Sequence, residues 1–158
     1  MEGVSDDEMT EALLLATGVM CDIAERSLAD AVTLPQYRAL VALASGGPIN
    51  LTKLASSLGV APSTANRMCE RLLRQKLISR ERHTVDSREI VLTLTPEGQT
   101  LIDDVLERRR REARSMLRAI PREDRLDLLA ALGLIASVAG DLPETHWTSG
   151  WQVKSAGG

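Results

Sequence analysis

Small polar side chains and arginines alternate in a short run near the middle of the chain. The run comprises Ser63, Thr64, Asn66, Arg67, Arg71 and Arg74. Hydroxyl and amide groups hydrogen-bond phosphate oxygens or base edges, and a guanidinium can bind O6 and N7 of guanine with two hydrogen bonds. The chemistry available to these residues is therefore recognition of a nucleic acid duplex, with Asn66 and Arg67 placed to contact bases.

A second polar group follows closely in the sequence and contains Arg82, Asp86 and Arg88. An arginine on a projecting loop can enter a minor groove, where narrow A·T tracts concentrate negative potential. Asp86 is placed to orient the Arg88 guanidinium, although the two could also form a surface ion pair with no further role. Residues 60–90 hold seven basic and four acidic side chains, although the whole chain has a net charge of −3. A local positive field is what a nearby phosphate backbone would experience.

Two predicted helices position the first group. Asn50 can cap a short helix that ends at Gly59, and the next helix has Pro62 in its first turn. Two helices joined by a three-residue turn containing glycine are typical of a helix-turn-helix. In the second helix the apolar spacing predicts a buried side made of Ala65, Met68, Cys69, Leu72 and Leu73.

A β-hairpin is predicted directly after these helices. Residues 78–82 and 89–94 have the composition of strands, and Ile90, Leu92 and Leu94 alternate with other residues along the second strand. The polar tip at 83–88 carries Asp86 and Arg88. The predicted fold is mainly α with a small β-hairpin wing, which is a winged helix-turn-helix.

Longer helices are predicted on either side of this unit. One covers residues 8–31, and Thr33 with Gln36 can form a capping box that begins the next helix. Thr95 and Pro96 begin a long charged helix that reaches about Ile120, and Pro121 begins the last helix. Residues 128–136 are apolar on every side, so we expect them to be buried.

That apolar surface exceeds what a monomer of this size can cover, so the chain is expected to dimerise. The residues expected in the interface are Leu128, Leu132 and Ile135. The polar, glycine-rich tail after 141, which includes Trp147 and Trp151, is expected to be poorly ordered.

Other classes of function lack a signal in the sequence. The acidic N-terminus does not resemble a secretory signal, and no apolar run approaches the length of about 20 residues that spans a bilayer, so a cytoplasmic location without membrane contact is expected. Cys21 and Cys69 fall in apolar helical patterns and are expected to be reduced core residues. Neither His83 nor His146 has metal-ligand spacing to a cysteine or carboxylate, and no nucleophile is paired with a base. We predict no metal, no cofactor and no enzymatic activity.

The run from Leu34 to Gly98 resembles the MarR family of bacterial transcriptional regulators. The segments that carry the resemblance are LPQYRAL at 34–40, LTKLASSLGVAPSTANRMCERLLRQKLISR at 51–80, DSR at 86–88 and LTPEG at 94–98. The resemblance implies a triangular homodimer in which the first helix and the last two helices form a helical dimerisation region. It also implies a repressor that is often relieved by a small phenolic or other effector, bound between the two regions. Some proteins of this family sense oxidants through a cysteine in the first helix, which is an alternative role for Cys21.

Two features depart from the family pattern. Ala61 stands where such proteins often have a capping Ser or Asp, and the near absence of aromatic residues does not favour an aromatic effector pocket. The predicted organisation is a dimerisation helix at 1–31, a DNA-binding unit at 32–95, dimerisation helices at 96–141 and a tail at 142–158. The predicted function is a sequence-specific DNA-binding regulator that acts as a homodimer on a pseudo-palindromic operator. The alternative is a winged helix that binds another protein without reading DNA.

Overall fold

The computed structural model describes residues 4–82 and 90–140. It is mostly helical with a two-stranded antiparallel hairpin, which confirms the predicted fold class. In chain order the elements are α1 (Asp6–Arg26), α2 (Leu34–Gly46), α3 (Leu51–Leu58), α4 (Pro62–Arg74), β1 (Ile78–Arg82), β2 (Ile90–Leu94), α5 (Pro96–Arg118) and α6 (Arg125–Gly140).

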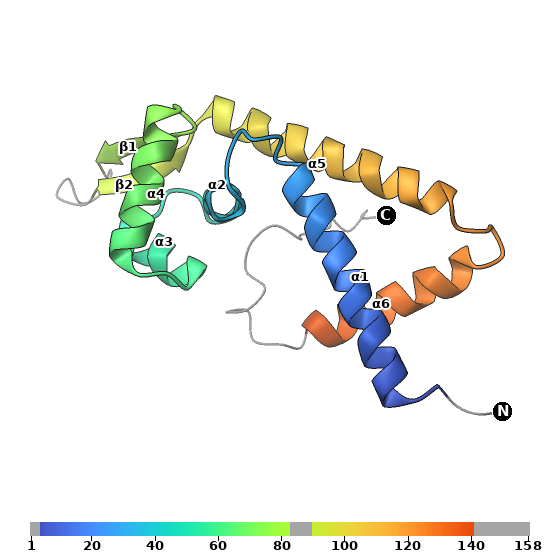
Figure 1. The fold of residues 1–158 in the computed structure, drawn as a ribbon. Helices are drawn as coiled ribbons and strands as arrows, with labels where there is room; N and C mark the ends of the chain where they lie inside the picture. Colours follow the sequence, from blue (N-terminus) through green and yellow to red (C-terminus); the bar gives the residue numbers. More distant parts are fainter. Residues whose placement is uncertain (1–3, 83–89, 141–158) are drawn as a thin grey trace, which may run out of the picture.

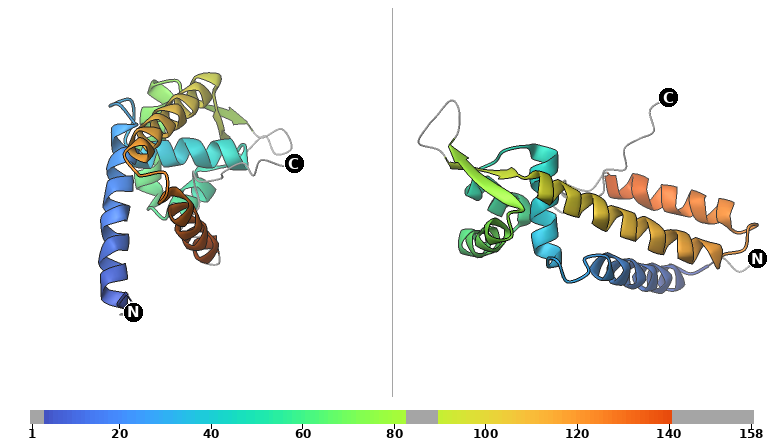
Figure 2. Two further views of the ribbon diagram at one scale, coloured as in Figure 1. Left: turned by 90° about the vertical axis from the view of Figure 1, so that its right-hand side faces the viewer. Right: turned by 90° about the horizontal axis from the view of Figure 1, so that it is seen from above.

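The elements divide the described chain into two ends. Helices α2, α3 and α4 gather with the hairpin at one end, and α5 extends from there to the other end (Figure 1). Helix α6 folds back from the far end of α5. Helix α1 lies on a different side of α5, as both views of Figure 2 show. We call the first group the winged lobe and α1, α5 and α6 the helical lobe.

Helix starts follow the capping residues in the sequence. Thr33 and Gln36 form the predicted capping box, in which the Gln36 side chain accepts from the Thr33 amide at 2.8 Å. The Asn50 side chain accepts from the Lys53 amide at 2.9 Å at the start of α3. The Thr95 hydroxyl accepts from the Gly98 amide at 3.0 Å at the start of α5. These contacts satisfy amides that have no partner within their own helices.

A single apolar core joins the winged lobe to the first half of α5. Its fully buried members include Leu40, Leu54, Leu72 and Val105, which come from α2, α3, α4 and α5. Tyr37 is buried in the same core, and the Arg109 guanidinium lies 4.7 Å from the centre of its ring. The start of α5 is therefore part of the winged lobe in packing terms.

The hairpin pairs Ile78 with Leu94 and Arg82 with Ile90, which agrees with the two predicted strands. Ile49 extends the sheet through a bridge to Leu92 on the other edge of β2. The predicted alternation along β2 is wrong in part, because Ile90 is exposed whereas Val91 is buried together with Leu92. Ile90 lies at the outer end of the strand, beyond the core that covers Leu92.

Two predicted helix boundaries are also wrong. The first helix ends at Arg26 rather than at residue 31, and Ala29 and Asp30 take left-handed backbone angles with φ of 49° and 59°. The last helix begins at Arg125 rather than at Pro121. Residues after Pro121 form a turn in which the Asp124 amide donates to the Pro121 carbonyl at 3.3 Å.

The helical lobe leaves most of its apolar side chains uncovered in the single chain. The segment 128–136 was expected to be buried, but most of it is exposed in the single chain. Leu128 is half-buried, and the side chains of Leu132 and Ile135 are 47% and 48% exposed. Cys21 is exposed on α1, so its prediction as a core residue is wrong for the single chain. Among the helices of the described part, none is both long and apolar enough to cross a membrane.

Candidate nucleic-acid interface

The turn between α3 and α4 has the geometry expected of a helix-turn-helix. Gly59 adopts a left-handed conformation with φ of 66°, which glycine reaches without a Cβ penalty. The Val60 amide donates to the Ala55 carbonyl at 3.1 Å, which closes the end of α3. Only Ala61 then remains before Pro62 begins α4.

Helix α4 has a buried and an exposed side. Ala65, Met68, Cys69 and Leu72 are buried as predicted, and Leu73 is half-buried. The six predicted contact residues of this helix are all exposed: Ser63, Thr64, Asn66, Arg67, Arg71 and Arg74. The apolar period therefore presents the polar and cationic side chains together on one surface.

Positive charges on the exposed side of α4 outnumber the negative ones. No carboxylate of residues 4–82 or 90–140 lies within ion-pair distance of Arg67, Arg71 or Arg74. The acidic residue of the helix, Glu70, is instead neutralised by Arg80 of β1, with 2.6 Å between guanidinium nitrogen and carboxylate oxygen. The exposed side of α4 is thus positive, which suits a phosphate backbone.

The first turn of α4 has no side-chain cap. Ala61 makes no capping hydrogen bond, and its carbonyl accepts from the Thr64 and Ala65 amides at 2.9 and 3.0 Å. The Ser63 amide is left at the positive end of the helix dipole beside two exposed hydroxyl groups. This arrangement is favourable for a phosphate oxygen.

The wing is described only in part. Arg82 is exposed at the end of β1, on the strand that leads to the tip. The two predicted tip residues, Asp86 and Arg88, lie outside the described residues, as does His83. His146 and both tryptophans also lie outside them.

The far end of α4 is a junction that the sequence patterns did not indicate. The Gln75 side-chain amide donates to the Ala31 carbonyl at 3.1 Å. The Thr95 hydroxyl donates to the Lys76 carbonyl at 2.7 Å, and the Thr95 amide donates to the Leu77 carbonyl at 3.2 Å. The exit of α4 therefore contacts both the α1–α2 connection and the start of α5.

A cavity of about 790 Å³ opens beside this junction. It is lined by the end of α1, the connection to α2, the first turn of α2 and the last turn of α4. Arg71 and Arg74 contribute from α4, Glu25 contributes from α1, and Asp30 contributes from the connection between α1 and α2. The cavity therefore has charges of both signs and lies between the helical lobe and the winged lobe.

Neither cysteine forms part of a metal site among the described residues. Burial raises the pKa of the Cys69 thiol to about 11, so this thiol is protonated at neutral pH, as a core residue should be. Within the described ranges no group of three His, Cys, Asp or Glu side chains could hold a metal ion.

In comparison with known proteins, residues 32–90 match the profile that defines the MarR family. The transcriptional repressor MdtR of Bacillus subtilis is 31% identical over 108 residues, which cover 68% of this chain and 70% of MdtR. The regulator MgrA of Staphylococcus aureus is 33% identical over 70 residues, which cover 44% of this chain. The chain therefore spans about half the length of MgrA (48%) in this match.

Solved structures agree over most of the chain. RV1404 of Mycobacterium tuberculosis has a TM-score of 0.79 at 37% identity, and the match covers 89% of this chain and 99% of RV1404. A mutant MepR of Staphylococcus aureus, solved bound to an oligodeoxyribonucleotide, has a TM-score of 0.68 at 19% identity, with 83% of this chain and 97% of MepR covered. The second likeness concerns the fold alone.

Proposed function

Because this chain belongs to the MarR family of winged helix-turn-helix transcriptional regulators, we propose that it binds duplex DNA as a homodimer and represses transcription from a pseudo-palindromic operator. The observation that carries the proposal is the exposed side of α4, where three arginines without an acidic partner among the described residues follow Ser63, Thr64 and Asn66. An α-helix of this kind fits the major groove, and its first turns reach the base edges.

Residue roles follow from position along α4. Arg67 and Asn66, one turn into the helix, are proposed to contact bases. Ser63 and Thr64, beside the helix N-terminus, are proposed to bind phosphate, and Arg71 and Arg74 extend the positive surface. At the wing we propose that Arg82 contacts the backbone and that Arg88, oriented by Asp86, enters the minor groove.

The helical lobe is proposed as the dimerisation region, formed by residues 1–31 and 96–141 around the DNA-binding unit at 32–95. Support comes from the uncovered apolar side chains of α1 and α6, among them Leu13, Leu132 and Ile135. Large exposed apolar patches mark contact surfaces, and most soluble oligomers are symmetric assemblies of identical chains. A two-fold dimer would place two copies of α4 about one turn of DNA apart.

A small-molecule effector, if the operator is relieved by one, has a candidate place in the cavity between the lobes. Its two arginines come from the proposed DNA-facing helix, so a bound acidic molecule would compete with DNA for the same charges. Comparing operator affinity with and without salicylate, a simple phenolic acid, tests this part of the proposal. We expect salicylate to weaken operator binding by the wild type and to have a smaller effect on Arg74→Ala; an operator affinity of the wild type that salicylate leaves unchanged would contradict salicylate binding in this cavity.

The DNA-reading role is tested by replacing Arg67 with Ala. The probes are a duplex selected by the wild-type protein from a random library and a scrambled duplex of the same length, measured by fluorescence anisotropy at several salt concentrations. Loss of a bidentate base contact should weaken the selected duplex by about 1–3 kcal/mol and leave the scrambled duplex nearly unchanged. Arg110→Ala is the matched control, since Arg110 lies on α5 and pairs with Glu107.

Two outcomes would contradict the proposal. An equal loss on both duplexes would make Arg67 a phosphate contact rather than a base contact. A wild-type protein with no salt-dependent binding to any duplex would favour the alternative, in which the winged lobe binds another protein.

A further inference from the structure

The exit of α4 carries a hydrogen bond between segments far apart in the sequence. Gln75 is the C-cap residue of α4, and its side-chain Nε2 donates to the backbone carbonyl of Ala31, 44 positions earlier. Ala31 belongs to the connection between α1 and α2. The bond therefore joins the proposed recognition helix to the segment from which α1 departs.

That connection has a conformation that its own sequence does not favour. Ala29 and Asp30 both have positive φ, a backbone conformation that is unfavourable for residues other than glycine. Such a conformation persists where its surroundings hold it. Leu28 and Val32 are buried on either side, and the Ala31 amide donates to the Leu28 carbonyl at 3.1 Å. The Gln75 bond holds the same segment from the side of α4.

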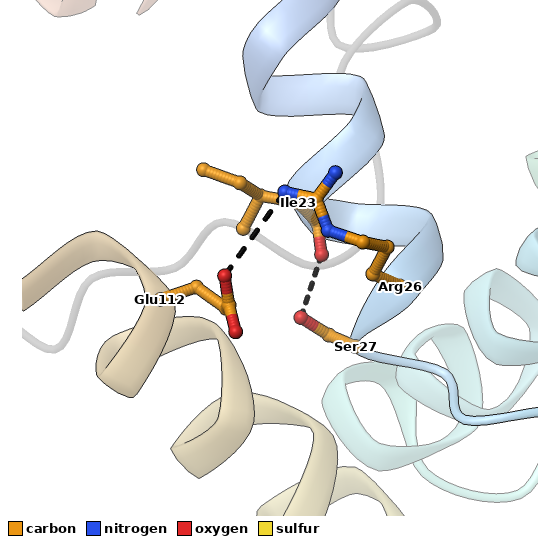
Figure 3. Close-up of polar contacts among 4 residues, drawn as sticks. All are labelled: Ile23, Arg26, Ser27 and Glu112. Atoms are coloured by element: carbon orange, nitrogen blue, oxygen red, sulfur yellow. Dashed lines mark hydrogen bonds and ion pairs between the residues drawn. The ribbon is translucent and has the colours of Figure 1, made fainter. Parts of the chain in front are cut away.

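Other contacts leave the direction of α1 weakly determined. Figure 3 shows the end of α1, where the Ser27 hydroxyl donates to the Ile23 carbonyl within the helix and Arg26 faces Glu112 of α5. The Arg26–Glu112 pair is separated by 4.0 Å and both side chains are about half exposed or more, so it contributes little. Beyond Ile23 toward the N-terminus, the described residues of α1 are exposed. The connection is thus a main determinant of where α1 points.

Helix α4, by contrast, is fixed inside the winged lobe. Its buried side packs into the common core together with the first half of α5, so the angle between α4 and α1 depends on α5 and on the α1–α2 connection. In a two-fold dimer formed through α1 and α6, this angle determines the distance between the two copies of α4. That distance in turn selects the spacing between half-sites on DNA.

We propose that Gln75 is a positioning residue: through its hydrogen bond to Ala31 it fixes the angle between α4 and α1, and so determines how strictly the dimer discriminates between half-site spacings. This inference rests on the proposed function and adds a residue that faces no base. Gln75 acts through the α1–α2 connection and needs no contact with DNA.

The test measures spacing discrimination rather than affinity alone. Full-length wild type, Gln75→Met and Gln75→Glu are titrated with the duplex selected by the wild type, with the same duplex carrying one inserted base pair between half-sites, and with a scrambled duplex. Both variants keep the length of the side chain and remove the donor at neutral pH. Any uniform effect of the added charge in Gln75→Glu cancels in the ratio of the first two affinities.

Gln99→Met is the matched control, because Gln99 also makes an exposed side-chain hydrogen bond, but to Asp103 within α5. We expect the inserted base pair to cost the wild type and Gln99→Met about tenfold in affinity. In both Gln75 variants the penalty should fall by about fivefold, the value of one ordinary hydrogen bond, and Gln75→Met should bind scrambled DNA as before.

Results that would overturn the inference differ from the result that would contradict the proposed function. An unchanged spacing penalty in the Gln75 variants overturns the inference, and so does an equal loss on all three duplexes in Gln75→Met, which would indicate a phosphate contact or impaired folding. A reduced penalty in Gln99→Met overturns it as well. A wild type that prefers no duplex contradicts the proposed function itself, and thermal melts of each variant identify any loss of folding.

Discussion

The two thiols of the chain lie in contrasting environments. Cys69 is fully buried on α4, and burial raises its pKa to about 11 from an ordinary value near 9. Cys21 is exposed on α1. A buried protonated thiol has a consequence for stability that an exposed one does not share.

We therefore expect the free energy of unfolding to fall as pH rises from about 9 to about 11. Below this range the thiol is protonated in both states, whereas within it the unfolded chain loses the proton and the folded chain keeps it. Burial also raises the pKa of Tyr37, which adds a change of the same sign at higher pH. Thermal melts across this range should show a smaller alkaline decline for Cys69→Ala than for wild type. Cys21→Ala is the control and should follow the wild type; coinciding curves for both variants would refute the role of Cys69.

Exposure of single residues was predictable where it depends on a local period. The apolar spacing of α4 places Asn66 and Arg67 outward, and the structure agrees. The role of Gln75 could not be predicted, since its partner Ala31 lies 44 positions away in a connection whose two left-handed residues are not glycine. The apolar pattern of its helix predicts that Cys21 is buried, but the side chain is exposed in the single chain. An apolar helix pattern does not specify which chain covers it.

At the scale of elements, the first turn of α5 lies against the turn that follows α4. A Cβ added at Gly98 would lie 2.2 Å from the Leu77 carbonyl oxygen and 2.6 Å from a Leu94 methyl carbon. The Leu77 carbonyl also accepts from the Thr95 amide, so it is held in place by a hydrogen bond. The close approach of these two elements therefore requires glycine.

Replacing Gly98 with Ala is expected to lower the free energy of unfolding by about 1–3 kcal/mol, because the backbone of one element must shift. Gly46→Ala is the matched control, since a Cβ there meets nothing within 4 Å and φ is not left-handed. Urea unfolding followed by far-ultraviolet circular dichroism measures both. A Gly98→Ala protein as stable as the control would show that the two elements are not tightly packed.

Element boundaries were predictable where a cap determines them and uncertain elsewhere. Thr33, Asn50 and Thr95 each accept from a first-turn amide, and the helices begin where these residues indicate. The end of α1 has no glycine to mark it, because Ala29 and Asp30 provide the left-handed turn. The start of α6 was predicted at Pro121, a favourable first residue, but the helix begins only at Arg125.

At the scale of the whole molecule, the sequence predicts both the winged lobe and the helical lobe. It does not predict which side chains of the helical lobe are buried within one chain. Residues 128–136 contain no polar side chain, yet most of them are exposed in the single chain. A helix that is apolar on every side needs cover, and the described chain does not provide it. In the proposed dimer this cover comes from a second copy of the chain, which neither a local pattern nor the fold of one chain specifies.

The proposed dimer can be tested at α6. If α6 lies in a dimer interface, Leu132→Asp should give a monomer at micromolar concentration, because each copy would bury an unpaired carboxylate at a cost of several kcal/mol. Ile90→Asp is the matched control: it introduces the same carboxylate at an exposed aliphatic residue, but in the winged lobe. Sedimentation velocity should show dimers for wild type and Ile90→Asp, and monomers or unfolded chains for Leu132→Asp. A folded wild-type monomer at this concentration, or a stable dimer of Leu132→Asp, would remove α6 from the interface. The apolar side of α1 would then need another partner.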